Sequence, residues 1–206
     1  MEAEAKFWDK VAPRYSKKPI DDVPAYEHKR RITQSVMTPE SEVLELGCGT
    51  GSTALIHAPF AKHIRATDIS DGMLNIARDK AKAKNISNVD FETVSVEDIK
   101  VENPVDMIMA HSLIHLLEDK QTVLKQIYNW LKPGGVLVTS TVCMGDSLGF
   151  FKYIGPVGKM LGLMPHLDVF TTEELVHSIQ ATGFEIDYKW RPEKGHSVFI
   201  IAKKPE

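Results

Sequence analysis

The fold is decided by the stretch Glu45-Leu46-Gly47-Cys48-Gly49-Thr50-Gly51-Ser52, which follows a short apolar run and opens a segment of helical composition. Glycine at every second position lets the backbone turn sharply and come within contact distance of a ligand. The first turn of the helix that follows offers N–H groups without an intrahelical partner. The stretch therefore predicts a ligand-binding turn between a strand and a helix.

The spacing of the glycines, G-x-G-x-G, narrows the class of ligand. A dinucleotide fingerprint, G-x-G-x-x-G, needs a glycine where Ser52 stands, and a phosphate-binding Walker loop needs a Gly-Lys-Ser/Thr ending that the chain lacks. Asp68 ends the next predicted strand, where a carboxylate can accept both hydroxyls of a ribose. These features favour a nucleoside cofactor, and the alternative is that the glycines only form a turn while Asp68 caps the next helix.

Outward from this turn, short apolar runs alternate with helical patterns, which is typical of an α/β protein with a mostly parallel sheet. The expected strands are residues 43–46, 64–67, 89–94, 105–110 and 136–141, and the expected helices are 52–60, 72–83 and 119–131. Ser70 or Asp71 is expected to cap the second helix. We expect Lys132-Pro133-Gly134-Gly135 to form a structural turn into the fifth strand.

Near the C-terminus, Thr171 and Glu174 have the spacing of a capping box, which predicts a helix that Gly183 ends. Residues 184–191 and 197–202 then predict a hairpin. The first 41 residues predict helices at 7–12 and 25–37. Residues 144–170 interrupt the pattern with an apolar segment containing four glycines and two prolines, and we expect all 206 residues to form one domain.

Composition excludes several classes of protein. Hydrophobic residues make up 43% and charged residues 26% of the chain, and the net charge is −3, so neither a disordered protein nor a basic nucleic-acid binder is expected. Two cysteines, Cys48 and Cys143, are too few for a disulfide framework. We expect a cytoplasmic protein without a transmembrane segment, because neither a signal peptide nor a long apolar run is visible.

Four stretches in order resemble class I S-adenosylmethionine-dependent methyltransferases, of the small kind similar to ubiquinone/menaquinone C-methyltransferases. They are E-L-G-C-G-T-G at 45–51, T-D-I-S-D-G-M-L at 67–74, V-D-M-I-M-A-H-S-L-I-H-L-L-E-D at 105–119 and L-K-P-G-G-V-L-V at 131–138. The resemblance implies a Rossmann-like, seven-stranded sheet with helices on both faces and its last strand antiparallel. It also implies S-adenosyl-L-methionine as the cofactor, lying across the carboxyl ends of the strands.

By position, the resemblance assigns Gly47 and Gly49 to the methionine part of the cofactor, Asp68 to the ribose, and Ile69 and Met73 to the adenine. The full set of implied cofactor residues is Glu45, Gly47, Cys48, Gly49, Asp68, Ile69, Met73, Ser95, Val96, His111 and Tyr15. Family members commonly have an Asp-Ala pair where this chain has Ser95-Val96. Residues 1–41 resemble the family's N-terminal lid, in which Trp8 and Tyr15 wall the site or Phe7 and Trp8 only pin a helix.

His111 is the catalytic candidate, because the resemblance places it where the methyl group is transferred and an imidazole can take a proton near neutral pH. Alternatively, it caps the next helix or bonds a carbonyl. His115 follows at i+4 and would share a helical face with His111, but no further ligand completes a metal site, so no metal is expected.

The apolar segment 144–170 is expected to select a small, apolar or lipid-like acceptor, or else to form a cap on the sheet edge. Phe150, Phe151, Tyr153, Ile154, Met160, Leu161, Leu163 and Met164 are its candidate lining residues, with His166 nearby. Lys152 and Lys159 fit either contact with a membrane surface or a solvated edge. Two rival functions are a non-catalytic cofactor-binding module on the same fold and a nucleotide-dependent oxidoreductase; the oligomeric state is not indicated.

Overall fold

The computed structural model describes residues 2–149, 164–193 and 195–206. The strands form a seven-stranded sheet in the order β3-β2-β1-β4-β5-β7-β6, mostly parallel, with the last strand of the chain antiparallel to both of its neighbours. This confirms the α/β class and the sheet that the resemblance implied. The chain divides into two compact units, Met1–Lys100 and Val101–Glu206.

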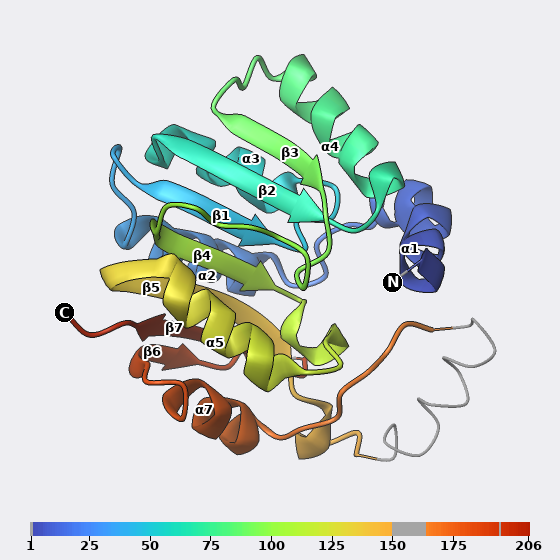
Figure 1. The fold of residues 1–206 in the computed structure, drawn as a ribbon. Helices are drawn as coiled ribbons and strands as arrows, with labels where there is room; N and C mark the ends of the chain where they lie inside the picture. The colour runs from blue at the N-terminus through green and yellow to red at the C-terminus, as the bar shows by residue number, and fades with distance from the viewer. Residues whose placement is uncertain (1, 150–163, 194) are drawn as a thin grey trace. The chain divides into compact units, whose positions relative to one another are not determined.

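The first unit contains the glycine loop and three parallel strands (Figure 1). Its elements are α1 (Glu2–Tyr15), α2 (Val23–Ser35), β1 (Glu42–Leu46), α3 (Ser52–His57), a 3-10 turn (Ala58–Phe60), β2 (His63–Asp68), α4 (Asp71–Ala83) and β3 (Val89–Thr93). Helix α4 packs against β2 and β3, and α1 packs against α4. The ends of β1 and β2, with the turns that follow them, lie at one edge of this parallel sheet, where ligands of such folds bind.

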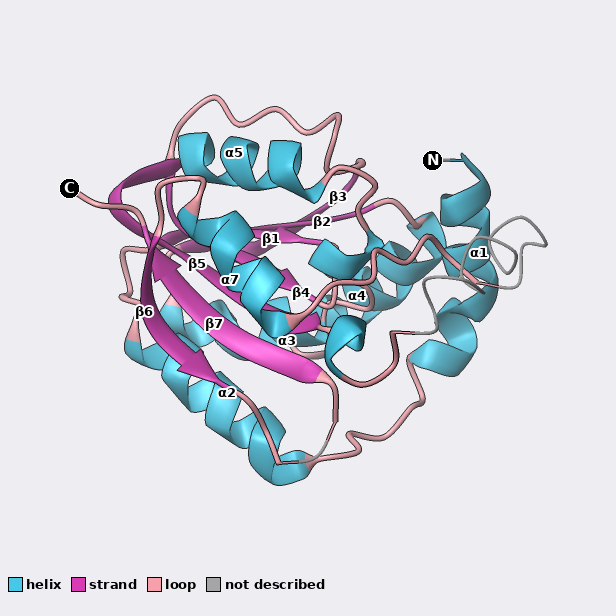
Figure 2. Cartoon of the chain, turned by 90° about the horizontal axis from the view of Figure 1, so that it is seen from below, coloured by secondary structure: helices cyan, strands magenta, loops and turns pink. Residues whose placement is uncertain are grey.

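The second unit holds the other four strands. Its elements are β4 (Val105–His111), a 3-10 turn (Ile114–Leu116), α5 (Lys120–Trp130), β5 (Leu131–Val142), a 3-10 turn (Met144–Asp146), α7 (Thr172–Gln180), β6 (Glu185–Trp190) and β7 (Ser197–Lys203). Strand β4 pairs in parallel with β5, and β7 lies antiparallel between β5 and β6. Helix α7 contacts α5 and β6, as Figure 2 shows.

Each unit has its own apolar core. In the first unit, Leu44, Leu46 and Ile64 are fully buried, and Leu74 of α4 packs with them out of solvent. In the second unit, residues 198–202 of β7, a strand between β5 and β6, are all buried, so side chains on both faces of this strand are covered. The short apolar runs in the sequence thus identified the inner strands correctly.

Two expectations about element boundaries were wrong. Helix α1 begins at Glu2 and ends at Tyr15, so it is longer than the predicted 7–12. The turn expected at 132–135 belongs to β5, which begins directly after α5. The physical reason is that Lys204 forms two backbone hydrogen bonds with this part of the chain. Gly134 N–H donates to Lys204 O at 3.0 Å, and Lys204 N–H donates to Gly135 O at 2.9 Å.

The expected pairing of His111 and His115 on one helical face was also wrong. His111 is the last residue of β4, and His115 lies in the 3-10 turn that follows, before α5 begins at Lys120. Elsewhere the local signals were confirmed. Ser70 caps α4 by accepting a hydrogen bond from Met73 N–H, and Thr171 and Glu174 form the complete capping box of α7.

Candidate active site

The glycine loop is held in a left-handed conformation by hydrogen bonds to the end of β2. Gly47, Gly49 and Gly51 have φ of 64°, 54° and 71°, a region that only glycine enters without steric cost. Cys48 N–H donates to Thr67 O at 2.9 Å, and Gly51 N–H donates to Cys48 O at 3.0 Å. The glycines are therefore required by the backbone path of the loop.

The three glycines differ in what surrounds them. A Cβ on Gly51 would lie 2.7 Å from Ala77 Cβ and 2.9 Å from Phe91 Cε1, so Gly51 permits close packing of the loop on α4 and β3. Among the described residues beyond its chain neighbours, just the Tyr15 ring, at 3.9 Å, would lie within 4 Å of a Cβ on Gly49. Gly49 is thus less closely surrounded than Gly51.

Asp68, the expected ribose ligand, is fixed by backbone amides. Its Oδ2 accepts from Gly49 N–H at 2.8 Å and its Oδ1 from Ser70 N–H at 2.9 Å. Burial raises the pKa of its carboxyl, and the amides of Ser70, Gly49 and Ile69 act against that rise. Because a carboxylate has about four acceptor positions, acceptor capacity remains for a ribose hydroxyl.

Glu45 in β1 and Cys48 in the glycine loop are buried. Glu45 is only 2% exposed, its Oε2 has no hydrogen-bond partner, and burial raises the pKa of its carboxyl to about 8. Burial, with the carboxylates of Glu45 and Asp68, also raises the pKa of the Cys48 thiol far above its usual range. Both groups therefore stay protonated at neutral pH, and the Cys48 thiol is no nucleophile.

Lys80 is a residue of this site that sequence reasoning missed. From α4, its Nζ donates to Thr50 O at 3.0 Å, to Thr50 Oγ1 at 2.8 Å and to Ser52 Oγ at 3.1 Å. Burial lowers the pKa of its ammonium. Lys80 thus ties the far side of the loop to α4, and no local motif marks a side chain that reaches so far along the sequence.

The residues expected around the adenine follow β2 and β3. Met73 and Val96 are buried and Ile69 is half-buried. Ser95 donates its hydroxyl to Asp98 Oδ2 at 2.8 Å and accepts from Asp98 N–H at 3.1 Å. The Ser95 hydroxyl is therefore engaged in a local turn, where the family commonly has a carboxylate.

In the second unit, His111 ends β4 beside a strained residue. Its ring stacks on Phe199, with the ring centroids 6.5 Å apart and the planes at 11°. Ser112 has φ of 52°, and its N–H donates to Ser140 O at 2.8 Å, so the chain turns back on β5 directly after His111. Such strain in a residue other than glycine is concentrated at functional sites.

His115 has a different environment from His111. Its side chain is buried, Nδ1 has no partner, and burial lowers the pKa of the ring to about 4. The backbone carbonyl of His115 accepts from Asp168 N–H at 2.8 Å. His115 is therefore a neutral, buried residue, and its backbone contacts the C-terminal part of the apolar segment at Asp168.

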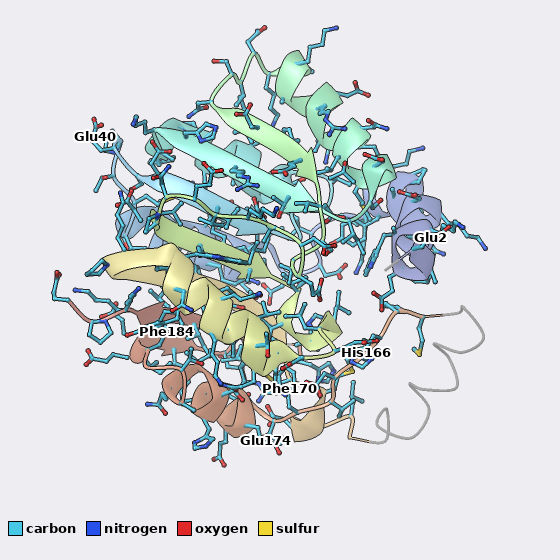
Figure 3. All side chains as sticks on the ribbon, in the orientation of Figure 1. Glu2, Glu40, His166, Phe170, Glu174 and Phe184 are labelled. Atoms are coloured by element: carbon cyan, nitrogen blue, oxygen red, sulfur yellow. The ribbon has the colours of Figure 1, made fainter. Side chains whose placement is uncertain are left out.

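The two ends of the segment 144–170 meet in the second unit. Gly145 N–H donates to Phe170 O at 2.9 Å, and a Cβ on Gly145 would lie 2.6 Å from the Phe170 carbonyl carbon. Asp168 forms an ion pair with Lys120 at 2.7 Å, and Asp146 forms one with Arg191 at 2.6 Å. Figure 3 shows His166 and Phe170 on the part that leads into α7.

The proposed lining of the acceptor site lies mostly outside the described residues. This holds for Phe150, Phe151, Tyr153, Ile154, Met160, Leu161 and Leu163, whereas Met164 is described and half-buried. Both cysteines are free, as expected. Across residues 2–149, 164–193 and 195–206, no helix is long and apolar enough to cross a membrane, and no three His, Cys, Asp or Glu side chains are grouped to hold a metal ion.

The sheet order and the glycine loop define a Rossmann-like, cofactor-binding class of protein. Residues 37–196 match the family model described as a methyltransferase domain, and the chain belongs to that family. Among curated relatives, it is 29% identical over 157 residues to malonyl-[acyl-carrier protein] O-methyltransferase of Priestia megaterium, covering 73% of this chain and 56% of that protein.

A second relative is the tRNA 5-carboxymethoxyuridine methyltransferase of Escherichia coli K12, 32% identical over 110 residues, which are 52% of this chain and 42% of the relative. The chain thus spans about half the length of these curated relatives. Among solved structures, the [4+2]-cyclase SpnF has a TM-score of 0.79 at 20% identity, over 98% of this chain and 94% of its own. The DhpI-SAH complex has a TM-score of 0.75 at 16% identity, over 99% and 96%.

Proposed function

We propose that this chain transfers a methyl group from S-adenosylmethionine to a small, apolar or lipid-like acceptor. The single observation that carries the cofactor assignment is the bond from Gly49 N–H to Asp68 Oδ2, at a glycine whose Cβ would have just the Tyr15 ring within 4 Å among the described residues beyond its chain neighbours. When bound, this cofactor supplies an activated methyl group, so the protein needs to align the acceptor and, for some acceptors, take a proton.

The residues of the first unit fit such a cofactor. Asp68 offers a fixed carboxylate for the ribose, Gly49 leaves room beside the loop, and the unpartnered Oε2 of Glu45 lies buried beneath it. The spacing G-x-G-x-G, with Ser52 in the place of a third dinucleotide glycine, favours S-adenosylmethionine over a nicotinamide cofactor.

Calorimetry with S-adenosylmethionine, its demethylated product S-adenosylhomocysteine and NAD tests the cofactor. We expect the first two to bind with similar affinity and NAD not to bind. Asp68→Asn turns one acceptor into a donor that faces a backbone N–H, so it should weaken binding by roughly 10- to 100-fold. Asp90→Asn is the matched control, because Asp90 is an exposed carboxylate on β3. Equal affinity in both variants would remove Asp68 from the site.

The acceptor class rests on the apolar composition of residues 148–170 and on the net charge of −3. The relatives' names include an acyl carrier protein, a tRNA, ubiquinone biosynthesis and phosphoethanolamine as contexts of methylation, so family membership does not select the acceptor. The test is transfer of a labelled methyl group into fractionated cell extract, with lipid, protein and RNA fractions counted separately. Label in the lipid fraction supports the proposal, and label in RNA or protein contradicts the acceptor class.

His111 is the proposed catalytic residue, supported by its position before the strained Ser112 and by its stacking on Phe199. If it takes a proton from the acceptor, His111→Ala should lower turnover by roughly 10²- to 10⁴-fold without changing affinity for S-adenosylhomocysteine. The wild-type rate should rise with pH through the imidazole titration, because only the neutral ring accepts a proton, and this limb should vanish in the variant. Near-normal turnover of His111→Ala would contradict the proton-accepting role and would mean that the enzyme acts by aligning the acceptor with the methyl group.

Binding of the cofactor without turnover on any fraction would support the alternative, a cofactor-binding module on the same fold. The specific observation behind this alternative is the likeness to SpnF, which is described as a [4+2]-cyclase although it shares the fold.

A further inference from the structure

Helix α1 is attached to the start of α4 through Asp9. Its Oδ1 accepts a hydrogen bond from Ser70 Oγ–H at 2.6 Å and a second from Gly72 N–H at 2.9 Å. Gly72 is in the first turn of α4, where backbone N–H groups have no intrahelical partner and where negative charge is favourable. Asp9 therefore completes the N-terminal cap of a helix that follows it far along the chain.

Glycine at position 72 makes this close attachment possible. A Cβ there would lie 3.0 Å from Asp9 Oδ1 and 3.2 Å from Asp9 Cα. Any larger residue would push the backbone of α1 away from the start of α4. The contact between α1 and α4 therefore depends on the residue types at both positions, Asp9 and Gly72.

Ser70 connects Asp9 to the proposed cofactor site. It is 0% exposed, and its backbone N–H donates to Asp68 Oδ1 at 2.9 Å while its hydroxyl bonds Asp9. The other oxygen of Asp68 accepts from Gly49 N–H. One continuous set of hydrogen bonds, running Asp9, Ser70, Asp68 and Gly49, therefore joins α1 to the glycine loop.

The same helix reaches the glycine loop at a second point. Tyr15, in the last turn of α1, brings its ring Cε1 to 3.9 Å from the Cβ position of Gly49. Trp8 contacts Tyr15 edge to face, with ring centroids 6.5 Å apart, and Phe7 contacts Trp8 in the same way at 5.3 Å. Helix α1 thus touches both ends of the hydrogen-bonded set, through Asp9 and through Tyr15.

We propose that Asp9 is a positioning residue that couples the docking of α1 to occupancy of the cofactor site. A ligand that bonds Asp68 and fills the space beside Gly49 contacts the two groups that α1 also holds. Because such coupling is reciprocal, the cofactor stabilises the docked α1, and the docked α1 tightens cofactor binding by the same factor. This inference rests on the proposed function for the identity of the cofactor, and on the contacts of α1 for the coupling.

The test combines S-adenosylhomocysteine affinity, by calorimetry, with hydrogen exchange of the amides of α1. In the wild type, the ligand should slow exchange across α1. Asp9→Ala should weaken affinity by about 5- to 50-fold, in the usual range of coupling between sites, and abolish the extra protection of α1. Lys10→Ala, an exposed neighbour on the same helix, is the matched control and should behave as wild type.

Two further variants separate coupling from a simple loss of stability. Asp9→Asn keeps a side-chain oxygen that accepts both hydrogen bonds, so it should retain most of the affinity. Gly72→Ala leaves Asp9 intact but displaces it, so it should lose affinity and α1 protection together. Unchanged affinity and protection in Asp9→Ala, or a loss in Asp9→Asn as large as in Asp9→Ala, would overturn the proposal.

The experiment also distinguishes failure of this inference from failure of the proposed function. If the wild type does not bind S-adenosylhomocysteine, the proposed cofactor is wrong. The role of Asp9 in docking is then still tested by exchange of α1 in the free protein, which should be faster in Asp9→Ala than in Lys10→Ala. Equal rates would overturn the docking role.

Discussion

Gly49 and Gly51 stand two residues apart in one loop. Both have a positive φ, but different atoms surround them. At Gly51 the missing Cβ makes room for Ala77 and Phe91, whereas a Cβ on Gly49 would have just the Tyr15 ring within 4 Å among the described residues beyond its chain neighbours. The spacing G-x-G-x-G does not distinguish the two glycines, but their surroundings differ. We propose that Gly51 serves the packing of the loop and Gly49 the binding of the ligand.

This difference predicts a larger loss of stability for Gly51→Ala and a larger loss of binding for Gly49→Ala. Gly49→Ala should cost about 1–2 kcal/mol of stability from its left-handed backbone and should weaken S-adenosylhomocysteine binding, because its methyl group enters the ligand space. Gly51→Ala carries the same backbone cost plus roughly 1–3 kcal/mol from overpacking. Urea unfolding and calorimetry measure the two effects. Gly49→Ala with wild-type affinity would show that the ligand does not approach this glycine.

Asp68 and Ser70 could be predicted from the sequence because each belongs to a local pattern, one ending a strand and the other capping a helix. Lys80 and Asp9 could not. Their partners lie 28 to 63 positions away in the sequence, so the contacts exist only after β2 and α4 have packed. Sequence patterns report periodicity and turns, and they carry no information about where a long side chain ends in space.

At the scale of elements, capping chemistry was the most informative signal. Thr171 Oγ1 accepts from Glu174 N–H at 3.1 Å, and Glu174 Oε2 accepts from Thr171 N–H at 2.7 Å. Both residues stand at the start of α7, next to Phe170, where the apolar segment 144–170 ends (Figure 3). The capping box therefore fixes the position at which that segment gives way to α7.

We expect Thr171→Ala to reduce the free energy of unfolding by about 1 kcal/mol, the usual cost of losing such a cap. Thr171→Ser keeps the hydroxyl and should retain most of the stability. Glu173→Ala is the control, since Glu173 is an exposed residue in the same turn that takes no part in the box. Urea titration of the three variants measures the difference, and equal stability of Thr171→Ala and Glu173→Ala would contradict the role of the cap.

The boundary errors also have physical causes at this scale. Pro133 with two glycines is typical of a turn, but the ladder bonds from Lys204 extend β5 through it. The apolar run after His111, which contains His115, suggested that both histidines lie in one helix. The positive φ of Ser112 is incompatible with a continuous right-handed helix from His111 to His115. In both places a contact with a distant strand overrode the local propensity.

For the whole molecule, the α/β class follows from the alternation of apolar runs and helical patterns along the chain, while the chemistry does not follow from the fold. The relatives are named as a malonyl-[acyl-carrier protein] O-methyltransferase and a tRNA 5-carboxymethoxyuridine methyltransferase, and a protein of the same fold is described as a cyclase. We propose that residues 148–170, of which 13 of 23 are apolar against 43% in the whole chain, select the acceptor. The cofactor could therefore be proposed from local motifs, and the acceptor only from composition.

Stability of the whole molecule should depend on pH through three buried groups. Burial raises the pKa of Glu45 to about 8 from 4.5, so between these values the folded protein holds a proton that the unfolded chain releases. Stability from this group is full below about pH 4.5 and is lost as the pH rises toward 8. Burial lowers the pKa of His57 and of His115 to about 4 from 6.5, so their contribution is full above pH 6.5 and is lost as the pH falls toward 4.

Glu45→Gln isolates the first of these effects, because glutamine keeps the shape and does not titrate. We expect the stability of this variant relative to wild type to increase between pH 4.5 and 8, with a slope of at most about 1.4 kcal/mol per pH unit, and to be constant outside that window. Urea unfolding of both proteins from pH 4 to 9 measures the difference, in which the contributions of His57 and His115 cancel. Glu40→Gln, the same change at an exposed residue before β1, is the control for the effect of the substitution itself. A difference between Glu45→Gln and wild type that does not vary with pH would mean that Glu45 is ionised in the folded protein, and the unpartnered oxygen beneath the glycine loop would then have to be satisfied as a carboxylate.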